Sequence, residues 1–288
     1  EIMSSDWSSD VCSSDLADYP VDAAYGARNV WDADYLLVIH GEDDGNTTVP
    51  DSTANLRDGT KVSAGNPLAA AGFMGAGQDF SGDHITAPAL GLAANQAVTF
   101  SAWIHPDTLG SYARIMDAPG DLDLALDSKQ GNAFLWEVNS ANYWFGGSAV
   151  STGAWHHVCA VHKGASLGIE VYQDGTALGE QSGNYAAGNN VFHIGNRGAH
   201  DRPFDGIIDE VRVSGIERSS AWIAAAYANQ NDPGAFYTIG AGGGPAGSVF
   251  VFTPAAGYLL SDTYTVSLTA ADLLGNAAGY TFGFTVNL

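Results

Sequence analysis

The chain has 288 residues and a hydrophobic content of 45%, which suits a packed core and argues against a largely disordered protein. Its 10 Lys and Arg face 32 Asp and Glu, and the resulting charge of −22 repels phosphate backbones, which argues against nucleic acid as a partner. No apolar run of about 18 residues is present, so no membrane-spanning helix is expected. The acidic surface favours cations as ligands, or only keeps an extracellular protein soluble.

The first residues are set apart from the fold. Asp6 to Leu16 resembles the translation of a sequencing-library adapter, so residues 1–16 are treated as an artefact. With Cys12 set aside, Cys159 is the one native cysteine, and no disulfide is expected. Cys159 lies in a predicted strand, where a small apolar side chain belongs in the core, so we expect an inert buried thiol rather than a nucleophile.

Strand signals separated by turn residues recur from residue 38 to residue 213. Residues 99–105 alternate between two faces with period two, which is typical of a strand. Shorter strands are predicted at 169–173 and 191–194. Asp174 and Gly175 together predict a type I′ hairpin turn, because this dipeptide accepts positive φ angles.

One convincing helix is predicted at residues 216–230. Ser219 and Ser220 offer hydroxyl groups for the N-cap, and the apolar side chains that follow share one face. We expect this helix to cover an edge of the strand structure.

A linker is predicted at residues 231–247, where three consecutive glycines precede Pro245. Beyond it, residues 248–288 alternate in polarity at 263–269 and at 280–286, which predicts two further strands.

Six short motifs occur in a fixed order along the chain. They are FSGD at 80–83, TFSAWI at 99–104, GAWHHV at 153–158, YQDG at 172–175, HIGN at 193–196 and FDGIIDEVRV at 204–213. Together they resemble the laminin-G-like, concanavalin A-like jelly roll of secreted and surface proteins. The resemblance implies an all-β fold, a concanavalin A-like jelly-roll β-sandwich over residues 38–230 with one short C-terminal helix. Because this fold carries lectins, adhesion modules and glycanases, it does not identify the ligand.

The flanking segments resemble parts of other domains. Residues 17–37 are similar to the tail of a domain that precedes laminin-G-like modules in prokaryotic surface proteins. Residues 248–288 resemble the second half of a bacterial Ig-like domain, notably in the turn at 272–276. These likenesses imply a larger secreted or cell-surface protein with neighbouring domains.

Calcium is the sharpest predicted cofactor. Asp51 and Asn55 stand where related modules carry an Asp-x-Thr-x-Asn-like turn, and Asp209 lies near the other end of the module. If the first and last strands meet, Asp51, Asn55 and Asp209 supply the oxygen ligands that Ca²⁺ prefers. In the alternative interpretation, Asp51 and Asn55 only cap a turn, and Asp209 or Glu210 pairs with Arg212.

Two other acidic clusters are interpreted as solvated loop charge, because neither has the glycine and glutamate of an EF-hand loop. The first comprises Glu42, Asp43 and Asp44, and the second comprises Asp121, Asp123 and Asp127.

Flat aromatic rings beside amide groups predict a glycan-binding surface, since sugar C–H faces stack on rings and amides bind hydroxyls. The candidates are Trp136, Tyr143 and Trp144 with Asn142, and more loosely Phe145, Asn139 and Asp201. Alternatively, these aromatic side chains fill the sandwich core.

Glycoside hydrolysis is expected to be absent. The strand signature Glu-x-Asp-x-x-Glu does not occur. Neighbours on a strand point to opposite faces, which removes Asp209 with Glu210 as a catalytic pair and His156 with His157 as a metal pair. We therefore expect a non-catalytic module that binds a glycan or a cell-surface or matrix partner, with a purely structural spacer or a glycoside hydrolase as alternatives.

Overall fold

The computed structural model describes residues 28–236, apart from 29, 44, 64, 119–121, 147–149 and 189, and the strand residues 238–239, 250–251, 263–271 and 277–285. The chain divides into two compact units, residues 1–233 and residues 234–288. The adapter-like segment, most of the predicted upstream tail and most of the predicted linker lie outside the described residues.

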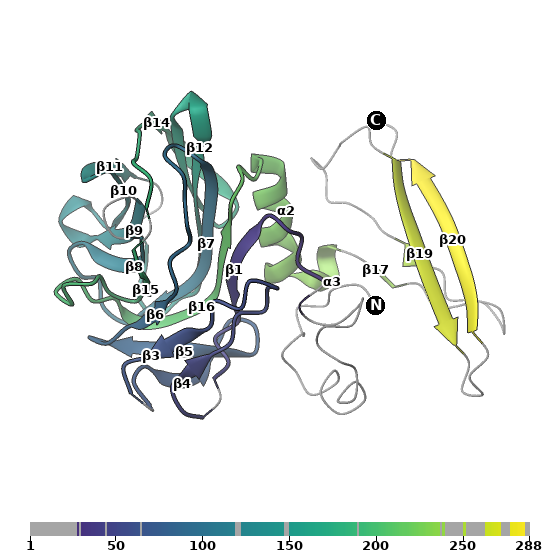
Figure 1. Ribbon diagram of the computed structural model, residues 1–288, viewed down its shortest axis with the longest axis horizontal. Coiled ribbons are helices and arrows are strands. Elements are labelled where there is room, and N and C mark those ends of the chain that lie inside the picture. The colour runs from purple at the N-terminus through teal and green to yellow at the C-terminus, as the bar shows by residue number, and fades with distance from the viewer. Residues whose placement is uncertain are drawn as a thin grey trace. The chain divides into compact units, whose positions relative to one another are not determined.

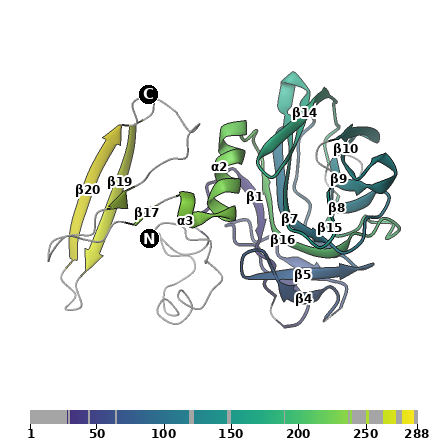
Figure 2. The ribbon, with the colours of Figure 1, turned by 180° about the vertical axis from the view of Figure 1, so that it is seen from behind.

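Two antiparallel sheets, A and B, make up the first unit (Figures 1 and 2). Sheet A has the order β14 (Thr176–Ser182), β13 (Gly168–Gln173), β12 (His156–Lys163), β7 (Ala97–Pro106), β16 (Asp205–Ser214), β5 (Ala76–Ser81) and β4 (Leu68–Ala71), and β1 (Tyr35–Ile39) also pairs with β16. Sheet B has the order β11 (Ala141–Phe145), β10 (Ala133–Val138), β9 (Leu122–Asp127), β8 (Ala113–Ala118), β15 (Phe192–Ile194), β6 (Ile85–Ala87), β3 (Gly59–Lys61) and β2 (Thr48–Val49). The predicted all-β sandwich is confirmed.

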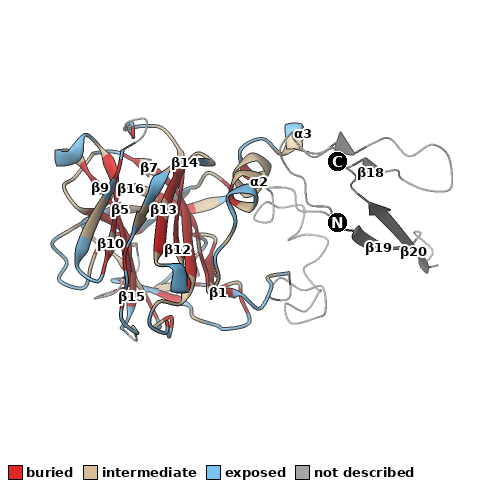
Figure 3. Cartoon of the chain, turned by 90° about the horizontal axis from the view of Figure 1, so that it is seen from above, coloured by how far each residue is buried: buried red, intermediate tan, exposed pale blue. Residues whose placement is uncertain are grey.

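The core lies between the inner faces of the two sheets (Figure 3). Phe100 of sheet A meets Trp136 and Phe192 of sheet B edge to face, with ring centroids 5.3 and 5.8 Å apart. Burying each large apolar side chain contributes about 1.5–3 kcal/mol to folding. This packing fixes which side of each strand faces outward.

The helix α2 (Ser220–Asn231) covers the outer face of sheet A, rather than an edge as predicted from the sequence. The Ser219 side chain caps it by accepting a hydrogen bond from the Trp222 backbone N–H. Ile223 packs against Cys159 and Tyr172, and burial raises the pKa of the Cys159 thiol. The predicted burial of Cys159 in the core is confirmed, and its inertness stays a prediction.

Of two local predictions, the hairpin turn at Asp174 and Gly175 agrees with the structure, whereas the start of the sandwich differs from it. Asp174 and Gly175 both have positive φ angles, 49° and 75°, and join β13 to β14 as the predicted hairpin turn. By contrast, β1 begins at Tyr35, inside the segment assigned to an upstream domain, and pairs with β16. Residues 35–37 therefore belong to the sandwich.

The remaining helical turns are short. They are η2 (Ser128–Gln130), η3 (Gly164–Ser166) and α3 (Pro233–Phe236). No helix in the described part of the chain is long and apolar enough to cross a membrane.

In the second unit, β17 (Thr238–Ile239) pairs with β18 (Phe250–Val251), and β19 (Thr263–Ala271) pairs with β20 (Ala277–Thr285). The alternating pattern predicted strands at 263–269 and 280–286, where β19 and β20 lie, while the turn at 272–276 lies outside the described residues. An Ig-like origin of this unit stays a prediction.

Candidate functional site

A line of polar residues crosses the outer face of sheet B, one from each of seven neighbouring strands. In strand order from β3 to β11 this polar row consists of Thr60, Thr86, His193, Asp117, Asp123, Glu137 and Asn142. Each residue is the direct cross-strand partner of the next, so their side chains stand on the same face. Inward-facing leucines on either side of Asp123 fix its orientation, because side chains alternate along a strand.

Arg114 of β8 sits beside the centre of the polar row and faces three of its carboxylates. Its guanidinium donates to Glu137 Oε2 and lies 3.4 Å from Asp123 Oδ2 and 3.8 Å from Asp117 Oδ1. The Arg114 and Asp117 side chains are each only 3% exposed. One buried cation is therefore shared among three acids, which leaves the centre of the polar row negative.

The electrostatics of Asp123 follow from this crowding. Burial raises the pKa of Asp123 well above its usual range, and the neighbouring Asp117 raises it further, while Arg114 partly offsets both effects. Asp123 thus keeps its proton to a higher pH than an ordinary carboxyl group. Its neutral form can donate a hydrogen bond as well as accept one.

Several buried polar atoms at the centre of the polar row have no hydrogen-bond partner among the described residues. They are Arg114 Nε and Nη1 and His193 Nδ1. Asp117 and Asp123 share a side-chain hydrogen bond, which contributes to the raised pKa of Asp123. His193 Nδ1 lies 3.6 Å from Asp117 Oδ2, too far for a direct hydrogen bond. Buried polar groups are normally satisfied, so this cluster suits bridging hydroxyl groups that both donate and accept.

Trp144 provides an exposed indole on the same face, next to Asn142 on β11. It is 37% exposed, and its Nε1 donates to Asp127 Oδ2 over 3.1 Å. Gln181 donates to the Trp144 backbone carbonyl over 3.0 Å. These contacts hold a flat apolar ring in a defined orientation beside the polar row.

The predicted aromatic set divides between the two faces of sheet B. Trp136 and Phe145 point into the core and are 0% and 3% exposed, so the prediction that they contact a sugar is wrong for both. Tyr143 is the cross-strand partner of Trp136 and packs partly buried against the same core. Only Asn142 and Trp144 stand on the outer face.

Two looser candidates lie in loops. Asn139 takes a positive φ of 50° in the connection between β10 and β11. Asp201 is tied to Arg197 by two hydrogen bonds of 2.5 and 2.8 Å. Neither belongs to the polar row.

The acidic clusters differ from the solvated loops that the sequence suggested. Asp123 and Asp127 lie in β9 and are 6% and 1% exposed, while Asp121 lies outside the described residues. Asp43 forms a buried ion pair with Lys61 over 2.7 Å. The alternation of leucine with aspartate in residues 122–127 was the overlooked signal for β9.

The predicted calcium ligands take part in two separate hydrogen-bond networks, and calcium stays a prediction. Both Asp51 oxygens accept hydrogen bonds from the protein, from Val38 N and Thr53 N at one oxygen and from Thr53 Oγ1 and Arg57 N at the other. Asn55 joins this network by donating to Thr53 Oγ1 and to the Tyr35 carbonyl. This arrangement is the turn-capping alternative, in which each Asp51 oxygen accepts two hydrogen bonds from the protein.

Asp209 belongs to a different network. A bulge interrupts β16 there, with Glu210 at a positive φ of 52°, so the simple alternation assumed for Asp209 and Glu210 does not hold. Asp209 accepts from Met74 N over 2.9 Å and from Glu210 N over 2.7 Å, while burial and the Glu210 charge raise its pKa. Glu210 pairs with Arg212 as the alternative predicted, and also with His40. Among the described residues, no group of three or more His, Cys, Asp or Glu is placed to hold a metal ion.

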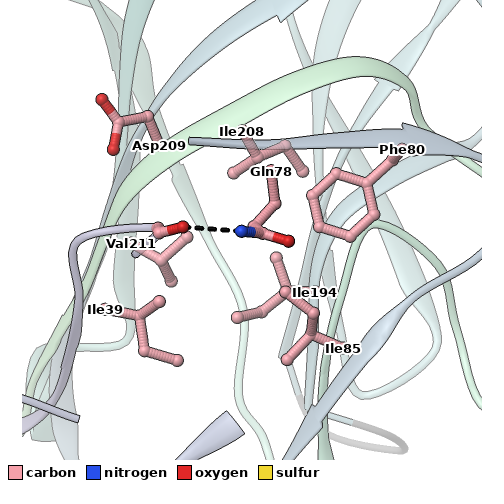
Figure 4. A pocket seen from close by; sticks show the side chains of 9 residues that line it. Ile39, Gln78, Phe80, Ile85, Ile194, Ile208, Asp209 and Val211 are labelled. Atoms are coloured by element: carbon pink, nitrogen blue, oxygen red, sulfur yellow. Dashed lines mark hydrogen bonds between the residues drawn. The ribbon is translucent and has the colours of Figure 1, made fainter. Parts of the chain in front are cut away.

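A small internal cavity lies between the sheets near β5 and β16 (Figure 4). It measures about 10 Å³ and is lined mainly by isoleucines and Phe80, with Gln78 donating to the Gly41 carbonyl over 2.7 Å. Such a volume is at the lower limit for one water molecule. A sugar would not fit in this cavity.

Comparison with known proteins places this geometry in a family. Residues 79–224 match the laminin-G-type family profile described as the concanavalin A-like lectin/glucanases superfamily. The chain belongs to this superfamily. No curated protein matches the sequence.

Solved structures of the same superfamily fold are similar at low sequence identity. Domain 4 of AbnA, an extracellular GH43 arabinanase from Geobacillus stearothermophilus solved with arabinotriose, is 21% identical with a TM-score of 0.55, covering 67% of this chain and 98% of that one. The binding domain of Paraclostridial Mosquitocidal Protein 1 is 11% identical with a TM-score of 0.55, covering 86% and 63%. A Trypanosoma rangeli sialidase complex is 18% identical with a TM-score of 0.52, covering 70% of this chain but 34% of the sialidase. These likenesses establish the jelly-roll fold.

Proposed function

We propose that this chain is a carbohydrate-binding module whose binding surface is the polar row of sheet B together with Trp144. The observation that carries the proposal is the polar row, in which Glu137 and Asn142 are half-buried and accessible, on the same face as an exposed indole. A saccharide ring offers C–H groups to the indole and hydroxyl groups to the polar atoms. One ligand class thereby matches both features.

The comparisons support this class of ligand. The arabinanase domain that covers 67% of this chain was solved with arabinotriose, and the sialidase is a carbohydrate-active protein. A soluble or polymeric glycan also suits an open surface better than the small internal cavity. We place the module in a secreted or cell-surface protein, where such glycans are met.

A glycoside hydrolase is the second candidate, and one observation favours it. Asp117, Asp123 and Glu137 are successive cross-strand partners, and facing side chains on neighbouring strands start about 5 Å apart. That spacing is compatible with the pair of carboxylates a retaining hydrolase needs. Arg114 argues against hydrolysis, because its guanidinium forms an ion pair with Glu137 and weakens the electrostatic interaction between Glu137 and Asp123.

Affinity electrophoresis of the full chain through gels containing arabinan, xylan, β-glucan or chitosan tests the proposal. We expect at least one polysaccharide to retard the chain, and Trp144→Ala to abolish the retardation while the melting temperature stays close to wild type. Trp222→Ala truncates an indole on the helix-covered side of sheet A and is the matched control.

Three other results would each change the conclusion. Absence of retardation in every gel would favour the structural spacer. Equal loss in Trp144→Ala and in Trp222→Ala would move binding away from sheet B. Release of reducing sugar that stops in Glu137→Gln would replace the binding module by the hydrolase.

A further inference from the structure

Ser151, His156 and Asp174 form a continuous hydrogen-bonded line at one end of sheet A, away from the polar row. Ser151 Oγ lies 3.1 Å from His156 Nε2, and His156 Nδ1 lies 3.0 Å from Asp174 Oδ2. These are the atom pairs and distances that link a nucleophile, a general base and an orienting carboxylate. His156 and Asp174 belong to the motifs GAWHHV and YQDG, but only the pairing of β12 with β13 brings them together, and Ser151 lies five residues before His156.

The fold holds the acid and the base firmly. Asp174 sits in the hairpin turn between β13 and β14, and its Oδ1 accepts the His157 backbone N–H over 2.8 Å. His156 is the first residue of β12, with its side chain 14% exposed. Two backbone elements therefore fix the imidazole relative to the carboxylate.

The proton positions follow from the charge of Asp174. Burial opposes its ionisation, but the hydrogen bonds from His156 and His157 hold the pKa of this carboxyl below its ordinary value. A carboxylate can only accept, so the proton of neutral His156 lies on Nδ1 and Nε2 is an acceptor. The Ser151 backbone N–H also points at Nε2, over 3.4 Å, which agrees with that tautomer.

Access to the serine differs from access to its partners. Ser151 is exposed, and it precedes β12 in an exposed turn. His157, the neighbouring histidine, faces the other side of the sheet as the cross-strand partner of Trp103. Burial lowers the pKa of His157 to about 3, so it stays neutral and plays no part in this line.

We propose that Ser151 and His156, positioned by Asp174, hydrolyse short acyl esters. Ser151 Oγ attacks the ester carbonyl carbon while His156 Nε2 takes the hydroxyl proton, giving a tetrahedral intermediate. The intermediate collapses, the C–O bond to the alcohol breaks, and Nε2 returns the proton to the leaving alkoxide. Water, deprotonated by the same Nε2, then attacks the acyl-serine; the bond between the acyl carbon and Ser151 Oγ breaks, and Nε2 returns the proton to Oγ, which releases the carboxylic acid and free Ser151. The balance is ester plus water to acid plus alcohol.

The open position of Ser151 determines the substrate class. An exposed serine suits a small acyl group, such as acetyl, carried on a larger molecule. This activity is separate from carbohydrate binding by sheet B, and it does not depend on that function.

The test treats the full chain with a fluorophosphonate probe, locates the adduct by mass spectrometry, and follows hydrolysis of 4-nitrophenyl acetate. We expect the adduct on Ser151, and both labelling and turnover to fall to the level of buffer in Ser151→Ala. Ser166→Ala removes another exposed serine hydroxyl, one that donates only to the Lys163 carbonyl, and should leave both signals unchanged.

Two further variants separate chemistry from folding. His156→Gln should lose labelling while the melting temperature shows that the fold is retained. Asp174→Asn keeps an oxygen for the His157 N–H but favours the wrong imidazole tautomer, so kcat should fall with KM unchanged. This split identifies Asp174 as a positioning residue, because a merely structural change would not act on kcat alone.

The contrary results are equally definite. Failure of the probe to label Ser151 in the folded wild type overturns the proposal. Labelling of Ser151 that persists undiminished in folded His156→Gln also overturns it, since the serine would then react without its base.

Discussion

The outer faces of the two sheets differ in what lies on them: a helix packs on sheet A, and a cluster of charged side chains lies on sheet B. On sheet A, α2 lies over the strands, Ile223 packs on Cys159, and Trp103 Nε1 donates to Gln230 Oε1 over 2.5 Å. On sheet B, the same side-chain alternation places Arg114, Asp117 and Asp123 outward, and Arg114 Nε and Nη1 have no hydrogen-bond partner among the described residues. Sheet A also carries buried charge, but there Glu210 is paired with Arg212 and His40, whereas on sheet B one arginine is shared among three acids.

This difference shows where a ligand is expected. Burying polar groups without partners costs free energy, so a sandwich built only for stability would place apolar or fully exposed side chains there. Residues whose placement lowers the stability of the fold concentrate at functional sites. The comparison therefore favours sheet B as the ligand-binding face, and the following changes are ways to break or sharpen it.

The largest effect is expected from the two tryptophans of sheet B that point in opposite directions. Trp136→Ala removes a fully buried ring and should lower the free energy of unfolding by about 3–5 kcal/mol. Trp144→Ala, on the outer face, should cost less than about 1 kcal/mol. Urea denaturation of both variants measures this; similar losses would mean that Trp144 is a core residue.

The next largest effect is expected at Arg114, the buried cation beside the polar row. Arg114→Met leaves the neighbouring carboxylates without their positive partner, and we expect a loss of about 3 kcal/mol at neutral pH. Because the folded variant takes up protons more readily than the unfolded chain, its deficit should shrink as the pH falls. Denaturation at pH 7.5 and pH 5 tests this, and a deficit independent of pH would rule out the charge explanation.

A smaller effect concerns Asp123, whose pKa is raised in the folded state. Between its unfolded pKa of about 3.9 and the raised folded value, the folded state holds a proton that the unfolded state has lost. Its contribution to stability is therefore present at low pH and is lost as the pH rises, by at most about 1.4 kcal/mol per pH unit.

Asp123→Asn should remove this dependence, so the stability of the variant relative to wild type should increase with pH. Asp34→Asn changes an exposed carboxyl group and serves as the matched control. Melting temperatures from pH 4 to pH 8 give the comparison. Parallel curves for wild type and Asp123→Asn would show that Asp123 titrates normally.

The smallest effect concerns the alkylation of Cys159. It involves no change in stability and tests whether α2 covers the outer face of sheet A. Cys159 lies fully buried beneath α2, and burial raises its thiol pKa, so a thiol reagent should modify it only when the helix opens. Alkylation is followed in a Cys12→Ser background, with urea-unfolded protein as the reference. Immediate reaction in the folded chain would show that the outer face of sheet A is open as well.

The sequence predicted the sandwich well because its signals are local. Ordered motifs, the alternation of residues 99–105 and the Asp174-Gly175 turn each describe a short segment, and these segments pair as expected. The family match over residues 79–224 agrees. Resemblance to a family was therefore sufficient to predict the fold.

The candidate site was harder to predict because it depends on register between distant strands. Asp117, Asp123 and Glu137 are unremarkable along the chain, and only the pairing of β8, β9 and β10 aligns them. The bulge at Glu210 likewise breaks an alternation that the sequence does not mark. For Trp136 and Trp144, the sequence shows that both residues are aromatic, but it does not show which face of sheet B each side chain occupies.

The most direct measurement of the central claim is hydroxyl-radical footprinting of the full chain with and without a polysaccharide that retards it in gels. Our account predicts that oxidation of Trp144 falls on binding while oxidation of Trp222, on the helix covering sheet A, stays the same. Protection of Trp222 with Trp144 unchanged would contradict the assignment of sheet B as the carbohydrate-binding face.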